Sequence, residues 1–271
     1  MLVKGHSGFG IELLDELTIR KSAAGAGAKR LQRQIEKQVL FYNQFQQAEV
    51  RTPGVLRTAQ AADRFQADME FIAAKDFIQF LSEADRQALD RFLKTITDFI
   101  RRNLARCEDV DVAERVRAKL FELEQKNVPQ NYIQAARTLC GSPVRIPVGP
   151  CHGDLTLSNL LFKRDHLYLL DFLDCYVESP FQDIVKLRQD TQFGWSLQLY
   201  QGEFNWPKIQ ITLRYLDQKI EAAFQPDEWF GRHYELFQIV NLMRVLPYCT
   251  EANTTALIIA SLDQLVAKSI T

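Results

Sequence analysis

Short apolar runs separated by turn-forming residues fill the first quarter of the chain. Residues 2–3, 11–14 and 17–21 are β-compatible, and glycines or acidic residues stand between them. Such punctuation is typical of consecutive hairpins. From residue 29 to residue 45, apolar positions recur every three or four residues, as on an amphipathic helix. Residues 50–56 and 64–72 return to strand patterning, so we predict a five-stranded antiparallel sheet with one inserted helix.

Longer amphipathic segments follow, which change the pattern from strands to helices. Residues 85–101 and 111–124 have helical periodicity, and so does the chain after residue 183. A short apolar hairpin is expected over residues 160–171. We therefore predict an α+β fold with an N-terminal nucleotide-binding lobe, residues 1–72, and a larger and mainly helical C-terminal lobe, residues 73–271.

Charge and cysteine content exclude several classes of protein. The 33 basic and 34 acidic residues leave a formal net charge of −1, which favours neither nucleic acid nor an anionic membrane as a partner. The five cysteines contain no CxxC pair and are expected to be reduced thiols. The sequence contains neither a signal-peptide pattern nor an apolar run of about 18 residues, so we expect a cytoplasmic protein.

The strongest chemical signal is the segment His152-Gly153-Asp154, followed by Asn159 and, at the end of an apolar run, Asp171. Phosphoryl transfer needs a carboxylate in a tight loop to orient the attacking hydroxyl. It also needs an amide oxygen and a second carboxylate to hold Mg²⁺ at the nucleotide phosphates. Asp154 fits the first role, and Asn159 and Asp171 fit the second.

This motif resembles the catalytic loop and metal-binding segment of the aminoglycoside and choline phosphotransferases, which share the bilobal protein-kinase-like fold. A protein kinase usually has Arg where this chain has Gly153, and Gly where this chain has Leu173. The resemblance thus implies an ATP- and Mg²⁺-dependent kinase acting on a small-molecule hydroxyl. A protein Ser/Thr kinase and a catalytically silent nucleotide-binding module are the alternatives.

The resemblance also implies phosphate-binding residues in the N-terminal lobe. Gly5, Gly8 and Gly10 would allow backbone amides to approach phosphate oxygens. Lys21 would neutralise the α- and β-phosphates, and strand alternation places the competing Arg20 on the opposite face. Glu36 resembles the helix glutamate that pairs with this lysine, although a solvated glutamate is an equal alternative.

The segment from Met69 to Ile72 resembles the hinge between the lobes. Backbone groups of Glu70 and Ile72 would bind the adenine, and apolar side chains such as that of Met69 would cover its faces. Only the position of the segment at the end of the predicted sheet supports this role, and an ordinary buried strand is the alternative.

Three further residues are candidates for substrate binding or support. Asp183 precedes a helical segment and is expected to cap that helix or to brace the catalytic loop. Asp174 follows the metal candidate and either faces Mg²⁺ or substrate or is simply exposed. Arg188 is one of the polar residues able to bind the acceptor, and His152 is expected to be structural.

The acceptor pocket is expected in the helical segments after Asp183. Positive and negative residues are mixed there, whereas a polycation site needs concentrated carboxylates and a choline site needs an aromatic cage. This favours a neutral or partly anionic acceptor such as a sugar. The sequence does not distinguish ATP from GTP.

Overall fold

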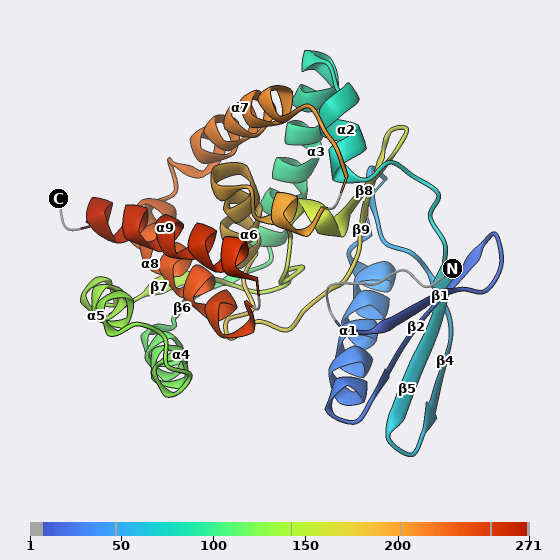
Figure 1. Cartoon of the computed structure of the whole chain (residues 1–271), viewed down its shortest axis with the longest axis horizontal. Coiled ribbons are helices and arrows are strands. Elements are labelled where there is room, and N and C mark those ends of the chain that lie inside the picture. Colours follow the sequence, from blue (N-terminus) through green and yellow to red (C-terminus); the bar gives the residue numbers. More distant parts are fainter. Residues whose placement is uncertain (1–7, 47, 142, 201, 250, 270–271) are drawn as a thin grey trace. The chain divides into compact units, whose positions relative to one another are not determined.

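The computed structural model describes residues 8–46, 48–141, 143–200, 202–249 and 251–269. The fold is mixed α+β, with an antiparallel sheet near the N-terminus and a mostly helical remainder, as predicted (Figure 1). The chain packs as two compact units: Met1–Ile96 with Leu157–Asp174, and Thr97–Thr156 with Cys175–Thr271. The predicted division after residue 72, which assigns lobes by nucleotide and acceptor roles, stays a prediction.

The N-terminal sheet of the first unit has four strands in the order β1-β2-β5-β4, all antiparallel. They are β1 (Gly10–Leu13), β2 (Thr18–Ala24), β4 (Val55–Ala61) and β5 (Arg64–Glu70). Asp15 and Glu16 lie in the turn between β1 and β2, where the backbone N–H of Leu17 donates to the Asp15 carboxylate. The hairpins follow the punctuation in the sequence.

Two details of the predicted sheet were wrong. Residues 50–56 do not form one strand, because Pro53 and Gly54 interrupt it after the short β3 (Val50–Arg51). β3 pairs in parallel with β9 (His166–Leu169), which also pairs with β8 (Leu160–Lys163) in a separate three-stranded sheet. The strand predicted at residues 2–3 lies outside the described residues.

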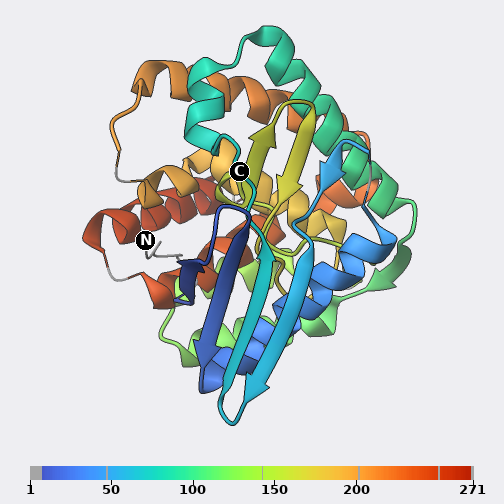
Figure 2. The same cartoon turned by 90° about the vertical axis from the view of Figure 1, so that its right-hand side faces the viewer.

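Helix α1 (Ala26–Gln44) covers one face of the N-terminal sheet, as Figures 1 and 2 both show. Leu31 and Ile35 on the helix pack with Phe65 and Met69 of β5 in a buried cluster. These four side chains are apolar at helical spacing on one element and alternate along the other, so the pairing follows from the two periodicities. The resulting core fixes the helix face that points to β2.

The β8–β9 hairpin packs on aromatic residues of the first unit. Phe162 stacks on Phe80 of α2 (Phe77–Glu83) with ring centroids 3.9 Å apart. Phe92 of α3 (Arg86–Leu104) meets the same ring edge-on at 5.5 Å. Backbone bonds between Lys75 and Phe162 in both directions complete the attachment.

The second unit is mainly helical. Its helices after the His152-Gly153-Asp154 motif are α6 (Pro180–Phe193), α7 (Trp206–Phe224), α8 (Glu228–Val245) and α9 (Ala252–Ser269), and those before it are α4 (Ala113–Gln125) and α5 (Gln130–Leu139). The strands β6 (Glu108–Asp111) and β7 (Arg145–Val148) pair in an antiparallel two-stranded sheet, and β7 leads into the motif. Within the described residues, 3₁₀ turns lie at Trp195–Leu199 and Leu246–Tyr248 in this unit and at Leu157–Asn159 in the first unit.

Helices α6 and α8 pack in the interior of the second unit: α6 is buried on nearly every side, and α8 is buried from Leu236 to Met243. Phe181 of α6 contacts Phe237 of α8 with ring centroids 4.9 Å apart. A helix buried on every side can carry polar residues only where they find partners. Two polar residues of α6 have such partners: Asp190 accepts hydrogen bonds from Ser196, and Gln189 accepts one from Asn241 of α8.

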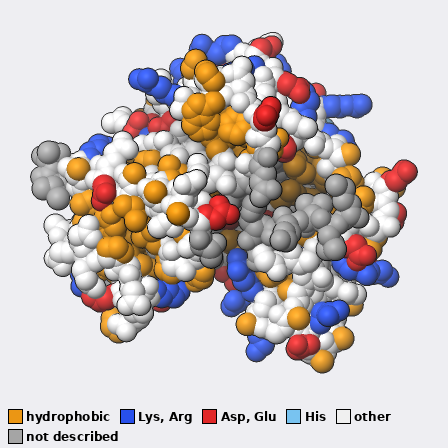
Figure 3. Space-filling view, viewed as in Figure 1, with side chains coloured by type: hydrophobic (Ala, Val, Ile, Leu, Met, Phe, Trp, Pro, Cys, Tyr) orange, Lys and Arg blue, Asp and Glu red, His pale blue; other side chains and the backbone are white. Residues whose placement is uncertain are grey.

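The surface in Figure 3 has basic and acidic side chains interspersed over the face that it draws. This agrees with the near-zero formal charge of the sequence. Among the described residues, no helix combines the length and the apolar run that crossing a bilayer requires.

Candidate active site

The loop from Cys151 to Asp154 follows β7, and a hydrogen bond to the side chain of His152 stabilises it. The imidazole of His152 is fully buried, and its Nδ1 accepts a hydrogen bond of 3.2 Å from the backbone N–H of Asp154. Gly153 has φ of 91°, a conformation that a residue with a Cβ rarely adopts. His152 thus has a structural role, and Gly153 allows the sharp turn that presents Asp154.

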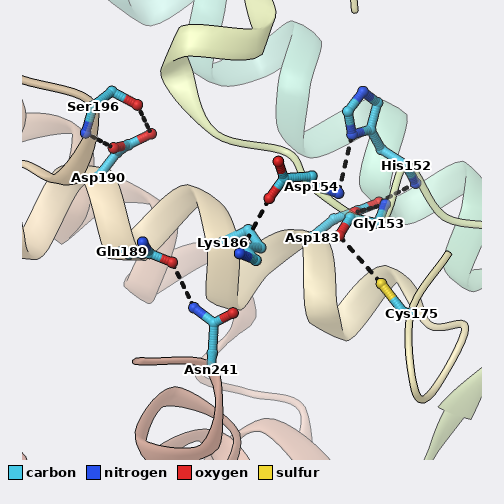
Figure 4. Close-up of polar contacts among 10 residues, drawn as sticks. All are labelled: His152, Gly153, Asp154, Cys175, Asp183, Lys186, Gln189, Asp190, Ser196 and Asn241. Atoms are coloured by element: carbon cyan, nitrogen blue, oxygen red, sulfur yellow. Dashed lines mark hydrogen bonds and ion pairs between the residues drawn. The ribbon is translucent and has the colours of Figure 1, made fainter. Parts of the chain in front are cut away.

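Asp183 of α6 binds the same loop from outside. Its buried carboxylate accepts hydrogen bonds from the backbone N–H groups of His152 at 2.8 Å and of Gly153 at 2.7 Å (Figure 4). Asp183 does not cap α6, because Ser179 is the N-cap and its Oγ accepts from the N–H of Phe181 at 3.0 Å. Of the two expected roles, the geometry therefore supports bracing of the loop.

Lys186, one turn after Asp183, points at Asp154. Its Nζ lies 3.1 Å from Asp154 Oδ1, and both side chains are largely buried (Figure 4). Burial raises the pKa of Asp154, but the charge and hydrogen bond of Lys186 outweigh it and leave the pKa below its ordinary value. Asp154 is therefore an ionised carboxylate at neutral pH, able to accept a hydrogen bond from a hydroxyl.

Lys21 meets Asp171 within the first unit. Its Nζ is 2.7 Å from Asp171 Oδ1 and 3.5 Å from Gln34 Oε1, and the lysine is buried. Arg20, the competing candidate, lies on the other face of β2 and pairs with Asp68 at 2.7 Å. Strand alternation thus distinguishes the two cations as expected.

Glu36 does not form the expected pair with Lys21. It is exposed and accepts a hydrogen bond of 2.9 Å from Gln32 Nε2 one turn away. Gln34 is the polar residue that α1 turns towards Lys21, because it shares the buried face with Leu31 and Ile35. Two residues along a helix rotate the side chain by about 200°, so Glu36 faces away.

Asn159 and Asp171 are brought together by the backbone of the β8–β9 segment. The N–H of Leu170 donates to the carbonyl oxygen of Asn159 at 2.9 Å, which places Asn159 beside the residue before Asp171. Asp171 has φ of 58°, an uncommon conformation outside glycine. The carboxylate of Asp171 and the amide oxygen of Asn159 are ligand types that Mg²⁺ prefers.

The segment that leads into β1 contacts Lys21 of β2. The ring of Phe9 is buried with its centroid 5.0 Å from Lys21 Nζ. Gly8 has a φ of 75°, which suits a turn, and Gly10 begins β1. Gly5 lies outside the described residues, so the structure says nothing about its expected role.

The proposed hinge forms the end of β5. Met69 is buried against α1, and the N–H of Glu70 donates to Gly54 O at 3.0 Å. The Glu70 carboxylate accepts from Gly54 N–H at 2.9 Å. These bonds involve the N–H and the carboxylate of Glu70. The carbonyl of Glu70 and the N–H of Ile72, which are backbone groups of the kind expected to bind adenine, take no part in them.

Two support candidates are held by partners of their own. Asp174 is half exposed, and its Oδ2 lies 3.3 Å from Arg33 Nε. Arg188 is 1% exposed and binds Asp217 in a bidentate pair with both N–O distances 2.9 Å. The Arg188 side chain is therefore committed to the interior of the second unit, and the expectation that it contacts the acceptor does not fit this geometry.

Comparison with known proteins identifies the family. Residues 20–211 match the model of the phosphotransferase enzyme family. The chain belongs to this family. The match spans Lys21, Asp154, Asn159 and Asp171 and covers more than half of the chain. A search of the curated proteins found no match.

Solved structures of aminoglycoside phosphotransferases share the fold of this phosphotransferase. The GDP and kanamycin complex of APH(2")-IIia is 15% identical, with a TM-score of 0.68 over 98% of this chain and 92% of that one. A thermostable mutant of APH(4)-Ia with ADP and hygromycin B is 11% identical, with a TM-score of 0.68 over 99% and 93%. APH(3'')-Id from Streptomyces rimosus is 15% identical, with a TM-score of 0.55 over 90% and 92%. The family and the shared fold make this phosphotransferase a small-molecule kinase.

Sequence reasoning did not assign specific site roles to Lys186 and Gln34. Lys186 follows Asp183 by three residues, so a bracing Asp183 implies that Lys186 also faces the loop. Gln34 shares the helical face of Leu31 and Ile35, which the apolar pattern had already defined. In this phosphotransferase both positions could have been found by combining a functional neighbour with helix periodicity.

Proposed function

We propose that this phosphotransferase transfers the γ-phosphate of ATP to a hydroxyl of a small molecule, and that Asp154 orients the hydroxyl. The observation that carries the proposal is the ion pair between Asp154 and Lys186 on a loop bound by Asp183. This arrangement keeps the carboxylate ionised and limits its movement. A fixed anion can accept the hydrogen bond of an attacking hydroxyl and take its proton as the new bond forms.

The residues around Lys21 are suited to nucleotide phosphates. The buried ammonium of Lys21 is a donor for phosphate oxygens, and Gln34 and Asp171 limit its movement. The N–H groups of the turn before β1, near Gly8 and Gly10, are proposed to cover the phosphates. The carbonyl of Glu70 and the N–H of Ile72 are proposed to bind the adenine, with Met69 beneath it.

The oxygen donors of Asn159 and Asp171 fit a hard divalent cation. An amide oxygen and a carboxylate on adjoining segments match the ligand chemistry of Mg²⁺, and Asp171 is accessible with 41% of its side chain exposed. Mg²⁺ bound there would neutralise charge on the nucleotide phosphates. Lys21, which now pairs with Asp171, would then be available to the nucleotide.

The acceptor is proposed to be a neutral or partly anionic hydroxyl compound, such as a sugar. Two carboxylates in the second unit are already neutralised or hydrogen-bonded inside it: Asp217 by Arg188, and Asp190 by Ser196. They therefore do not add to a cluster that would attract a polycation. The solved neighbours bind kanamycin and hygromycin B, so aminoglycosides belong among the acceptors to test.

A phosphate-transfer screen tests this function. Purified protein with Mg²⁺ and either ATP or GTP is incubated with sugars, amino alcohols or aminoglycosides, and ³¹P NMR follows the phosphorylated product. The Asp154→Ala variant is the blank. We expect acceptor-dependent product with wild-type protein only. Equal product from Asp154→Ala would contradict the assignment of Asp154.

A further inference from the structure

Two cysteines and a glutamate meet beside the catalytic loop in the second unit. The Sγ atoms of Cys151 and Cys175 and a carboxylate oxygen of Glu178 all lie within 4.8 Å of one another. Cys151 Sγ donates to Glu178 Oε2 at 3.1 Å, and Cys175 Sγ donates to the carbonyl oxygen of Gly153 at 3.2 Å. Figure 4 shows Cys175 directed at the loop that carries Asp154.

We infer that Cys151, Cys175 and Glu178 form a binding site for a thiophilic divalent cation of the Zn²⁺ type. Two thiolates and a carboxylate are three of the ligands that such an ion takes in a tetrahedral shell, and water can supply the fourth. With metal–sulfur bonds of about 2.3 Å, the ligand atoms of a tetrahedral site stand roughly 3.5–3.8 Å apart. The ligand atoms here lie within 4.8 Å of one another, so metal binding requires them to move closer by about 1 Å.

The surroundings of Glu178 favour this use. The backbone N–H of Cys175 binds Glu178 Oε1 at 2.7 Å, so one carboxylate oxygen is anchored while the other faces Cys151. The backbone carbonyl of Glu178 is itself fixed by the N–H of Gly149 at 2.9 Å. Such supporting hydrogen bonds orient the ligands before the metal arrives.

Charge also favours a complex at this position. A divalent ion with two thiolates and one carboxylate has a net charge of about −1 by ligand counting. Glu178 directly precedes Ser179, the N-cap of α6, where the positive end of the helix dipole stabilises a negative charge. Cys151 is buried, whereas Cys175 and Glu178 are partly exposed and leave a route for the ion.

Binding would change the contacts of the catalytic loop. Cys175 loses its thiol proton to solvent and with it the hydrogen bond to Gly153, and Cys151 loses its proton and its bond to Glu178. Both changes act on residues adjoining His152 and Gly153. This site therefore goes beyond the proposed phosphate transfer and would couple a soft metal to the loop of Asp154.

Cd²⁺ serves as the probe, because thiolate coordination gives a charge-transfer absorption in the ultraviolet. Reduced full-length protein without nucleotide is titrated with Cd²⁺ in the presence of excess Mg²⁺, which as a hard ion should not compete for thiolates. We expect saturation at about one equivalent, with release of about two protons. A competition titration with Zn²⁺ should displace Cd²⁺ from the same site.

Variants locate the metal. Cys175→Ser and Glu178→Gln should each weaken binding by more than the roughly 10–100-fold typical of losing an outer-shell contact. Cys249→Ser, a partly exposed cysteine elsewhere in the unit, is the matched control and should bind as wild type does. Thermal melts establish that each variant is folded. Failure of the wild type to saturate near one equivalent, or unchanged affinity in folded Cys151→Ser/Cys175→Ser protein, would overturn the site. The outcome does not depend on kinase activity.

Discussion

The carboxylate of Asp183 accepts a hydrogen bond of 2.7 Å from the backbone N–H of Gly153, inside the second unit. A second bond of 2.8 Å, from the N–H of His152, reaches its other oxygen. An ionised acceptor that binds two successive N–H groups fixes the direction of that peptide segment. The direction in which the loop presents Asp154 therefore depends on a buried carboxylate of α6.

Replacing Asp183 tests this dependence. In Asp183→Asn one carboxylate oxygen becomes an NH₂ group that cannot accept, so one loop N–H loses its partner. Hydrogen bonds to charged groups contribute about 1.5–3 kcal/mol, and we expect a loss of stability in that range together with a lower kcat. Chemical denaturation and steady-state kinetics measure the two effects. Asp174→Asn, at a half-exposed carboxylate, is the control and should change stability little.

Lys186 sets the pH range over which Asp154 is ionised. Burial raises the pKa of Asp154, and Lys186 is the main group that lowers it, so Lys186→Met should raise that pKa relative to the wild type. The acidic limb of the kcat profile should then move to higher pH, because the variant protonates Asp154 earlier as pH falls. Lys219→Gln, at an exposed lysine of α7, should leave the profile unchanged. An unshifted acidic limb in Lys186→Met would show that the pair does not control the essential carboxylate.

Lys21 and Glu36 should respond differently to substitution. Lys21→Met removes a buried cation next to Asp171, and we expect ATP affinity to fall by about 10–100-fold, the worth of a charge-assisted hydrogen bond. Glu36→Gln should bind ATP as wild type does, because Glu36 is exposed and bonded to Gln32. Calorimetric titration with a non-hydrolysable ATP analogue distinguishes them. A comparable loss of affinity in Glu36→Gln would instead support an ion pair between Glu36 and Lys21 in the nucleotide-bound protein, and it would contradict the role given to Gln34.

Arg188 should act on stability rather than on acceptor binding. In Arg188→Met the carboxylate of Asp217 loses its cationic partner and keeps the hydrogen bond from Thr191. Breaking a buried ion pair in this way costs about 3–5 kcal/mol of stability. The double variant Arg188→Met/Asp217→Leu should recover part of that loss, since it removes both charges. Thermal unfolding provides the comparison. A single variant with normal stability and a raised acceptor KM would instead place Arg188 at the acceptor.

Sequence periodicity predicted the sheet, the first helix and the β8–β9 hairpin, because these elements are set by local alternation and turn residues. It failed where a contact distant in sequence decided the outcome. Val50 and Arg51 form a separate strand since β9, more than a hundred residues later, supplies their partner. Likewise, the sequence suggested that Arg188 binds the acceptor, because its partner Asp217 lies on α7 and cannot be assigned to it from local sequence.

The site shows the same division between local and distant information. Asp154, Asn159 and Asp171 stand out by spacing alone, and the choice of Lys21 over Arg20 follows from strand alternation. The choice between Gln34 and Glu36 required the direction of α1 on the sheet. The cluster of Cys151, Cys175 and Glu178 was missed because its members lack any metal-binding spacing in the sequence and meet only through the turn before α6.

Steady-state kinetics of Asp154→Asn with an identified acceptor test the central claim most directly. The substitution keeps the size of the side chain and removes the charge that Lys186 stabilises. A carboxylate that orients and deprotonates the hydroxyl contributes about 10²–10⁴-fold in rate, so kcat should fall by about that range while ATP affinity changes little. Full turnover by folded Asp154→Asn would contradict the account and direct attention to another carboxylate, with Asp174 the first to examine.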